Sequence, residues 1–154
     1  MKTSGEKLIS NNRKAHFNYF LSDFREAGIV LTGTEIKSLR LHSCDLNDAY
    51  VIFRSGAPYI INMHIAPYDK GNIFNHDPLR ERKLLLHKRE ILKLAQEVKE
   101  QSVTVIPTRI YFKNGLAKVE IALGKGKKLY DKRETIKKRD DERAMAKAQK
   151  GSHD

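Results

Sequence analysis

The clearest hydrophobic pattern lies in the second half of the chain. Residues 103–112 are rich in β-branched and aromatic residues, and in 117–123 apolar residues alternate with polar or small ones. Such alternation is typical of a strand with one buried face. Asn114-Gly115, between the two segments, readily adopts the positive φ angles of a type I′ turn. The pattern therefore predicts a β-hairpin.

Shorter patterns extend the β-structure toward the N-terminus. Apolar residues in 49–53 and 59–65 flank the turn-forming segment 54–58, which predicts a second hairpin. The segment 16–32 begins with alternating apolar residues and ends with a short apolar run. It predicts two further strands, joined at 26–28.

Two segments have helical spacing instead. Residues 34–41 carry apolar side chains at helical intervals, and Thr32 or Thr34 is suited to cap this helix. Residues 88–101 have one apolar face and a charged outer face. About six short antiparallel strands therefore predict a mainly-β fold, a small OB-like barrel with two or three flanking short helices. The pattern does not separate this barrel from an SH3-like one.

The apolar pattern ends before Gly124. This change divides the chain into a barrel domain, residues 1–123, and a basic tail, residues 124–154. The thirty residues after Gly124 include eleven Lys or Arg and six acids. Asp131 is suited to cap a helix, with Glu134 completing a capping box, and the next sixteen residues contain no Gly or Pro. Because the tail lacks an apolar stripe, we predict that it is disordered when free and helical on a charged partner.

The formal net charge of +11 in 154 residues indicates a polyanionic partner, since solubility alone needs far less. Both the barrel and the tail are basic, so RNA contact need not be confined to either. Phosphate binding would release counterions and make affinity fall steeply with salt. The alternatives are an acidic membrane surface, which the lack of a suitable amphipathic helix disfavours, and a merely soluble basic protein.

The sequence also indicates the cellular compartment of the protein. It contains no apolar run long enough to span a membrane, and its N-terminus lacks the apolar stretch of a signal peptide. Cys44 is the only cysteine, so no internal disulfide can form. We expect a cytoplasmic protein in which Cys44 is a small buried packing residue rather than a reactive thiol.

Candidate RNA-binding residues begin near the N-terminus. Asn12, Arg13 and Lys14 place two cations beside an amide, ahead of a predicted strand. Such a group suits phosphates together with a sugar or base. A solvated segment leading into the strand explains the pattern equally well.

The first predicted helix carries a second group. Its apolar positions face the core, which leaves Glu35, Lys37, Ser38 and Arg40 on other faces. Because an acid repels phosphate, we expect Glu35 to accept hydrogen bonds from a base edge or a ribose hydroxyl. Taken alone, a salt bridge from Glu35 to Lys37 or Arg40 is the more economical explanation.

A third group lies in 77–87. We expect residues 84–86 to anchor this segment in the core while Arg80, Arg82 and Lys83 face outward. Arginine suits phosphate recognition because its planar guanidinium binds two oxygens at once.

The sequence shows no catalytic or metal-binding pattern. The six histidines lack paired spacing and cysteine partners, so no zinc site is apparent. The glycine-lysine segment 124–128 does not have the spacing of a phosphate-binding loop, and Asp45 and Asp48 suit a turn better than a metal. We therefore expect no enzymatic activity, no metal or other cofactor and no small-molecule substrate.

Taken in order, these motifs resemble the SsrA-binding protein family, also called small protein B. The resemblance covers roughly residues 6–140. Its motifs are Asn12-Arg13-Lys14-Ala15, Glu26-Ala27-Gly28-Ile29, Gly33-Thr34-Glu35-Ile36-Lys37-Ser38-Leu39-Arg40, Asp77-Pro78-Leu79-Arg80, Arg82-Lys83-Leu84-Leu85-Leu86-His87, Gly126-Lys127-Lys128 and Asp131-Lys132-Arg133.

The resemblance implies an OB-like barrel, one face of which binds the tRNA-like domain of tmRNA in bacterial trans-translation. Aminoacylated tmRNA with elongation factor Tu would be a further partner. The RNA-binding residues expected from these motifs and from the charge pattern are Asn12, Arg13, Lys14, Glu35, Lys37, Ser38, Arg40, Arg80, Arg82, Lys83 and Lys118.

For the tail, the resemblance implies insertion into the empty mRNA channel of a stalled ribosome, near the small-subunit decoding centre. Gly124 and Gly126 would form its hinge. Tyr130 occupies a position where many relatives carry histidine. The tail residues expected to contact the ribosome are Lys127, Lys128, Tyr130, Asp131, Lys132, Arg133, Lys137, Lys138 and Arg139.

Two other functions stay open at this stage. One is a general structured-RNA or ribosome-assembly protein that uses the same barrel and tail. The other is an RNA-processing enzyme, which the missing catalytic pattern disfavours.

Overall fold

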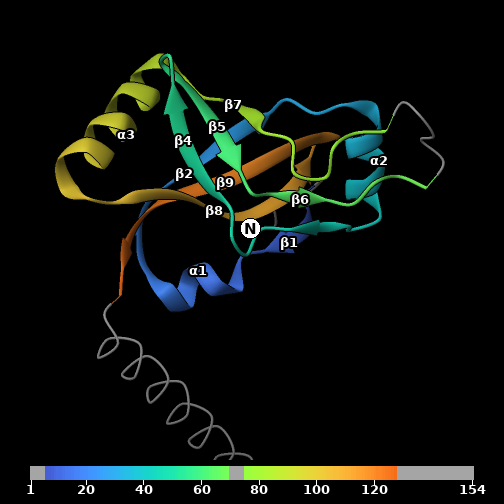
Figure 1. Cartoon of the computed structure of the whole chain (residues 1–154), viewed down its shortest axis with the longest axis horizontal. Helices are drawn as coiled ribbons and strands as arrows, with labels where there is room; N and C mark the ends of the chain where they lie inside the picture. Colours follow the sequence, from blue (N-terminus) through green and yellow to red (C-terminus); the bar gives the residue numbers. More distant parts are fainter. Residues whose placement is uncertain (1–5, 70–74, 128–154) are drawn as a thin grey trace, which may run out of the picture.

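Antiparallel pairing joins most strands of this protein into a closed ring (Figure 1). The computed structural model describes residues 6–69 and 75–127. In chain order, its elements are β1 (Glu6–Asn11), α1 (Arg13–Asn18), β2 (Tyr19–Ile29), α2 (Gly33–Arg40), β3 (Cys44–Asp45), β4 (Tyr50–Arg54), β5 (Ala57–Ile61), β6 (His64–Ile65), β7 (Arg82–Leu85), α3 (Lys88–Gln101), β8 (Thr104–Lys113) and β9 (Leu116–Gly126).

In the ring, β8 pairs with β4, β4 with β5, β5 with β7, β7 with β2, β2 with β9, and β9 again with β8. Strand β1 adds to β8 as an edge strand, and β3 pairs with β6 outside the ring. The predicted mainly-β antiparallel barrel with a few short helices is confirmed.

Every strand of the ring contributes aliphatic side chains to one core. Leu39 of α2 and Leu94 of α3 are fully buried and join it. Burial of one such side chain stabilises the fold by roughly 1.5–3 kcal/mol. The helices are therefore held to the barrel by their apolar faces, as their spacing predicted.

Helices α2 and α3 form where the sequence predicted them. Thr32 caps α2: its hydroxyl accepts a hydrogen bond from the N–H of Glu35 at 3.4 Å. In return, the Glu35 carboxylate accepts from the N–H of Thr32 at 2.8 Å. This capping box turns the Glu35 side chain back toward the start of the helix.

Both predicted hairpins are confirmed. Asn114 and Gly115 have φ angles of 52° and 80°, as a type I′ turn requires. The β4–β5 hairpin turns more tightly than predicted, at Ser55 and Gly56, whose φ angles are 52° and 77°. Its second strand ends at Ile61, and the last residues of the predicted strand form β6 in the other sheet.

The prediction of two strands in 16–32, joined at 26–28, is wrong. Helix α1 takes up the first residues, and β2 then continues through the predicted joint with β9 on one side and β7 on the other. The chain bends instead at Asp23, where φ is 51° and the register with β9 shifts. Gly28 serves close packing rather than a turn, because a Cβ there would lie 3.2 Å from the Cβ of Leu85.

The predicted end of the barrel domain lies inside β9, which continues to Gly126. The expectation of a hinge at Gly124 is wrong, because this residue is packed: an added Cβ would lie 2.7 Å from Cδ1 of Ile106. Gly126 also belongs to the strand, and the N–H of Lys127 donates to the carbonyl of Asn18 at 2.8 Å. The rest of the tail, with its predicted disorder and helix, lies outside the described residues.

We predict that Gly115→Ala lowers the free energy of unfolding by about 1–2 kcal/mol, because a side chain is strained at this left-handed φ. Urea unfolding followed by circular dichroism measures the change. Gly126→Ala is the matched control, since it is exposed and an added Cβ there meets no atom within 4 Å. Equal losses in the two variants would contradict the role of the turn.

Candidate nucleic-acid interface

A buried ion cluster joins α2 to the loop before β7 and to β7 itself. Glu35 and Arg82 have fully buried side chains, and Nε of Arg82 donates to Oε2 of Glu35. Arg80, which is partly exposed, donates from Nη2 to Oε1 of Glu35 at 2.6 Å and from Nε to Oε2 at 3.3 Å. With the N–H of Thr32, four donors converge on one carboxylate.

The same arginines also hold backbone segments in place. Nη1 of Arg82 donates to the carbonyl of Met63 at 2.7 Å, and its Nη2 donates to that of Pro78 at 3.3 Å. Nη2 of Arg80 donates to the carbonyl of Val30 at 3.2 Å. The cluster therefore fixes three loops against the start of α2.

The cluster is ionised at neutral pH. Burial acts to raise the pKa of Glu35, but hydrogen bonds from Arg80, from the backbone of Thr32 and from Arg82 outweigh it, so the pKa lies below its ordinary 4.5. Burial also lowers the pKa of Arg82. The guanidinium nevertheless stays charged, because its ordinary pKa is so high. Each charge thus needs the other inside the protein.

Three residues that were expected to project outward are buried: Glu35, Ser38 and Arg82. Strand alternation explains Arg82, since β7 turns this side chain inward and Lys83 outward. The capping box turns Glu35 toward Arg82, and Ser38 follows one turn later on the same helix face. None of the three side chains is positioned to meet RNA directly.

The cations left at the surface of this region are Lys37, Arg40, Lys83 and, in part, Arg80. Nζ of Lys37 lies 5.5 Å from the centroid of the Tyr68 ring. Within the described part of the chain, Arg40 and Lys83 have no carboxylate partner. Their charge is free for an external anion.

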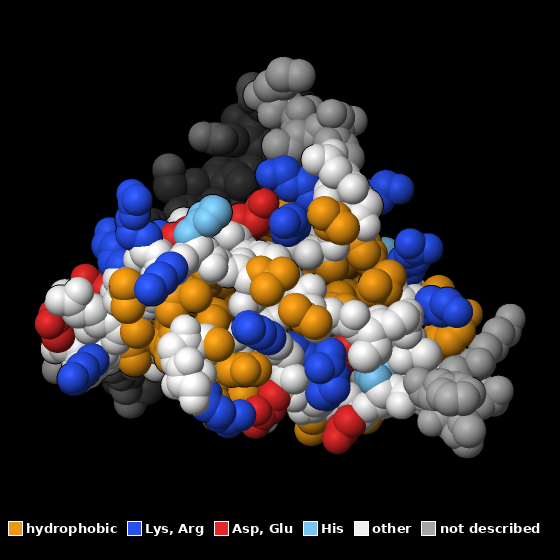
Figure 2. All heavy atoms as spheres, turned by 90° about the horizontal axis from the view of Figure 1, so that it is seen from above, with side chains coloured by type: hydrophobic (Ala, Val, Ile, Leu, Met, Phe, Trp, Pro, Cys, Tyr) orange, Lys and Arg blue, Asp and Glu red, His pale blue; other side chains and the backbone are white. Residues whose placement is uncertain are grey.

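Residues of β2, β7 and β9 line two connected hollows, and we call this surface the hollowed face. Glu26, Leu85 and Lys118 line one hollow of about 400 Å³. Leu85 and Lys118 also line a second hollow of about 220 Å³, with Ile36 of α2 and Leu116. Figure 2 shows one face of the molecule, on which apolar side chains gather with Lys and Arg around and between them. An apolar floor with cationic edges suits unpaired bases and their phosphates.

Glu26 is a residue of this face that the sequence interpretation missed. Its Oε2 accepts from the hydroxyl of Tyr111 at 2.6 Å and from Nζ of Lys113 at 3.3 Å. The hydrogen bond from Tyr111 is the main cause that lowers the pKa of Glu26, and Lys113 and Lys118 add to it. The alternation of exposed residues along β2 places Glu26 on the outer side of the strand, and the sequence does not show this alternation.

The N-terminal candidates lie at the other end of the barrel. Asn12 is buried, since its Oδ1 accepts from the N–H of Ala15 to cap α1 and its Nδ2 donates to the carbonyl of Pro107 at 2.8 Å. Arg13, the first residue of α1, is exposed. Lys118 lies eight residues before the end of β9, roughly 25 Å along the strand from α1. The structure therefore separates this group from the hollowed face.

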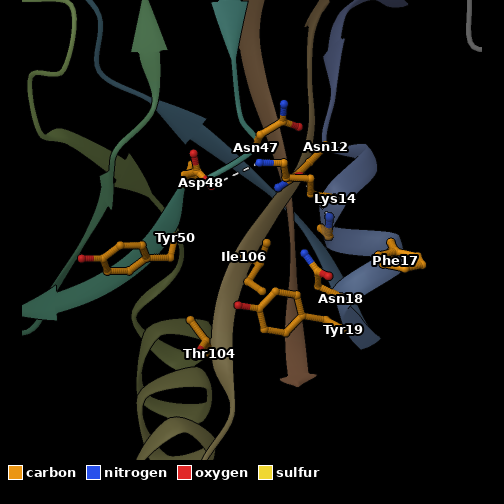
Figure 3. Close-up of a pocket in the computed structure, with 12 residues that line it drawn as sticks. Asn12, Lys14, Phe17, Asn18, Tyr19, Asn47, Asp48, Tyr50, Thr104 and Ile106 are labelled. Carbon is orange, nitrogen blue, oxygen red and sulfur yellow. Dashed lines mark hydrogen bonds and ion pairs between the residues drawn. The ribbon is translucent and has the colours of Figure 1, made fainter. Parts of the chain in front are cut away.

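A cleft of about 640 Å³ opens beside α1 (Figure 3). Lys14 lies at one end of the cleft, with Nζ 3.8 Å from Oδ1 of Asp48. Tyr19, Tyr50 and Ile106 line its other parts. The cleft combines one cation, one acid and aromatic rings, whereas Lys118, Glu26 and Glu90 are the charged residues that line the hollows of the hollowed face.

The start of the tail lies against α1. Nζ of Lys127 is 3.4 Å from the carbonyl of His16 and 5.0 Å from the centroid of the Phe20 ring. The other predicted ribosome contacts lie outside the described residues: Lys128, Tyr130, Asp131, Lys132, Arg133, Lys137, Lys138 and Arg139.

The described residues do not bring together three His, Cys, Asp or Glu side chains in a way that could hold a metal ion. Asp45 stabilises a turn, because its Oδ1 accepts from the N–H of Asn47 at 2.8 Å. Burial raises the pKa of the Cys44 thiol to about 12, so the thiol is protonated at neutral pH. Among helices in the described ranges, none has the length and apolar character needed to cross a membrane.

Known proteins are similar to this chain over nearly its whole length. The SmpB protein family matches residues 9–151. The SsrA-binding protein of Geobacter metallireducens is 58% identical over 144 residues, which is 94% of each chain. That of Trichodesmium erythraeum is 54% identical over 145 residues, 94% of this chain and 93% of the relative. A chain of the solved structure "tmRNA-SmpB: a journey to the center of the bacterial ribosome" matches with a TM-score of 0.66 and 45% identity, over 78% of this chain and 85% of that one.

We predict that Glu35→Gln lowers the free energy of unfolding at neutral pH by about 3–5 kcal/mol, because it leaves Arg82 buried without a counter-charge. Since the pKa of Glu35 is lowered by folding, its contribution is present above its unfolded pKa and is lost as pH falls through its folded pKa. The difference between the two proteins should therefore shrink in acid. Urea unfolding at a series of pH values measures it.

Glu81→Gln is the control for this experiment, because it removes a carboxylate from the exposed pair with Arg54. A surface pair contributes little, so this variant should unfold like the parent protein. A Glu35→Gln variant as stable as Glu81→Gln would show that the buried cluster is not needed.

Proposed function

Because the chain belongs to the SmpB family of SsrA-binding proteins, we propose that it binds tmRNA and acts with it in trans-translation on stalled ribosomes. The observation that carries this function is the match to the family and its relatives over nearly the full length of the chain. The solved tmRNA-SmpB structure, with a closely similar fold, supports the same partners. The free cations beside an apolar surface fit an RNA ligand.

The hollowed face is the proposed tmRNA-binding surface. Lys118, which lines its hollows, would contact phosphates or bases there. We propose Lys37, Arg40, Arg80 and Lys83 as further contacts, since their charged groups reach the surface. The buried Glu35, Ser38 and Arg82 would act indirectly, by fixing the helix and loop that present these cations. Recognition would then depend on the shape of a folded RNA, because the cations are held at set positions.

The α1 end of the barrel is the proposed ribosome-facing side. Arg13 and Lys14 lie there in α1, and the N–H of Lys127, from which the tail begins, donates to the carbonyl of Asn18 at the end of the same helix. The tail carries most of its charge as Lys and Arg, and residues such as Asp131, Lys132 and Arg133 would contact ribosomal RNA around the empty mRNA channel. In this arrangement the barrel selects the tmRNA and the tail tests the ribosome.

The proposed mode of action is binding without catalysis, in the cytoplasm where ribosomes translate. Two carboxylates line the hollowed face, and both are already bound: Glu26 by Tyr111 and Lys113, and Glu90 by Arg25. Such a surface binds and orients an RNA, and it leaves chemistry to the ribosome.

We predict that the chain binds the tRNA-like domain of tmRNA at least tenfold more tightly than an RNA duplex of equal length at physiological salt. Lys83→Ala and Lys118→Ala should each weaken this binding and reduce its salt dependence by about one counterion. Filter binding or fluorescence anisotropy over a range of salt concentrations measures both quantities. Lys93→Ala on α3 is the matched control, an exposed lysine outside the hollowed face. Equal affinity for the two RNAs would overturn the tmRNA assignment in favour of a general RNA-binding role.

We predict that a chain ending at Lys127 keeps most of its affinity for the tRNA-like RNA but no longer supports tagging on ribosomes stalled at the end of a broken message. The reason is that the hollowed face lies within the retained residues. A reconstituted translation reaction measures tagging, with the full chain as control. Loss of RNA affinity on truncation would show that the tail is the main RNA anchor.

A further inference from the structure

A groove of about 480 Å³ lies between the end of α2 and the edge strand β1. Leu8, Leu39 and Phe112 give it apolar walls, and Leu8 is 45% exposed. Arg40 and His42 line it from the end of α2 and the residues that follow. The groove thus combines apolar surface with two flat side chains that carry π-electrons.

The charge of this groove is positive and uncompensated. Lys7 and Arg40 line it, and no acidic side chain of the described residues does so. Neither cation forms an ion pair within residues 6–69 and 75–127, whereas Arg25, Arg82 and Arg109 each have a carboxylate partner. The ligand that fits is therefore anionic as well as partly apolar.

Polar groups that could form hydrogen bonds with a ligand are also present. β1 pairs with β8 alone among the described strands, so its other edge has no strand partner there. Nδ1 of His42 lies 3.2 Å from the carbonyl of Ile9 and must be the donor, because a carbonyl only accepts. In the neutral ring, Nε2 is then an acceptor.

The backbone of His42 holds this ring in an unusual position. Its φ angle is 58°, a left-handed conformation that residues other than glycine seldom adopt. The conformation follows the last turn of α2, where the N–H of His42 donates to the carbonyl of Leu39 at 2.9 Å. The imidazole thereby lines the groove, as Arg40 also does.

We propose that this groove binds one unpaired nucleotide from a loop of the tRNA-like RNA, an inference that rests on the proposed function. The base would lie against the apolar wall and stack on His42 or the Arg40 guanidinium, and Lys7 would meet a flanking phosphate. Bases in a duplex are stacked inside the helix, so only an unpaired base can enter. Phe112 and Gly115 line both this groove and the hollow that contains Lys118, so the site continues the proposed tmRNA surface.

The test pairs protein variants with single abasic substitutions at each unpaired loop position of the tRNA-like RNA. His42→Asn removes the ring, yet asparagine tolerates the left-handed conformation. His42→Asn and Arg40→Ala should each weaken binding of the intact RNA about tenfold, as loss of a stacked base does. For one abasic RNA, already weakened, neither variant should weaken binding further.

Lys93→Ala is again the control, and its effect should be the same on every RNA. Circular dichroism and thermal unfolding of each variant establish that it is folded, and Lys7→Ala provides a variant at an exposed position of the same groove. If Lys7 contacts only a phosphate, Lys7→Ala should reduce the salt dependence of binding equally for the intact and the abasic RNAs.

Two results would overturn the site. If His42→Asn and Arg40→Ala weaken all abasic RNAs as much as the intact RNA, the groove holds only the sugar–phosphate backbone. If neither variant changes affinity while the parent protein still prefers the tRNA-like RNA over duplex, the groove is empty in the complex and the proposed function stands. A parent protein without that preference would remove the proposed function and this site together.

Discussion

The parts of this protein that are proposed to meet RNA are held in place by a carboxylate that solvent does not reach. Glu35 accepts hydrogen bonds from two arginines and from the backbone at the start of its own helix. Without it the charged guanidinium of Arg82 would be buried and unpaired, which would cost several kcal/mol. Because Arg82 also binds the carbonyl of Met63, the position of α2 and the course of the chain around β7 depend on the same group of atoms.

This buried cluster means that cations counted alike in the sequence fall into two kinds, buried and exposed. Arg82 is buried and binds groups inside the fold, whereas Lys83, next to it in sequence, is exposed and can bind a partner. Arg80 stands between them, since it touches Glu35 and is still partly exposed. A net charge counted from the sequence treats all three alike, so it overstates what an RNA can reach. Rigid presentation compensates for this loss, because a cation fixed in space discriminates between RNA shapes better than one on a mobile chain.

The sequence predicted the local elements better than the side-chain directions. Helix α3 and both hairpins were predictable because apolar periodicity and turn residues such as Asn114 and Gly115 act locally. The burial of Glu35 was not, because its partners lie 45 and 47 residues away. Gly28 was interpreted as a turn for a related reason: close contact with Leu85 and a turn both select glycine, and only the tertiary structure distinguishes them. The resemblance identified the family correctly, but a motif does not tell which of its residues face the solvent.

The continuous course of β9 has a further consequence. One strand carries Lys118 at one end and leads into Lys127 at the other, where the chain is bonded to α1. A strand paired on both sides neither stretches nor bends freely, so it holds the two proposed RNA contacts at a fixed distance. Each residue added to the strand would increase that distance by about 3.3 Å and turn every following side chain to the opposite face. Under the proposed function, the number of residues between the two lysines would therefore set the distance between the tmRNA contact and the ribosome contact.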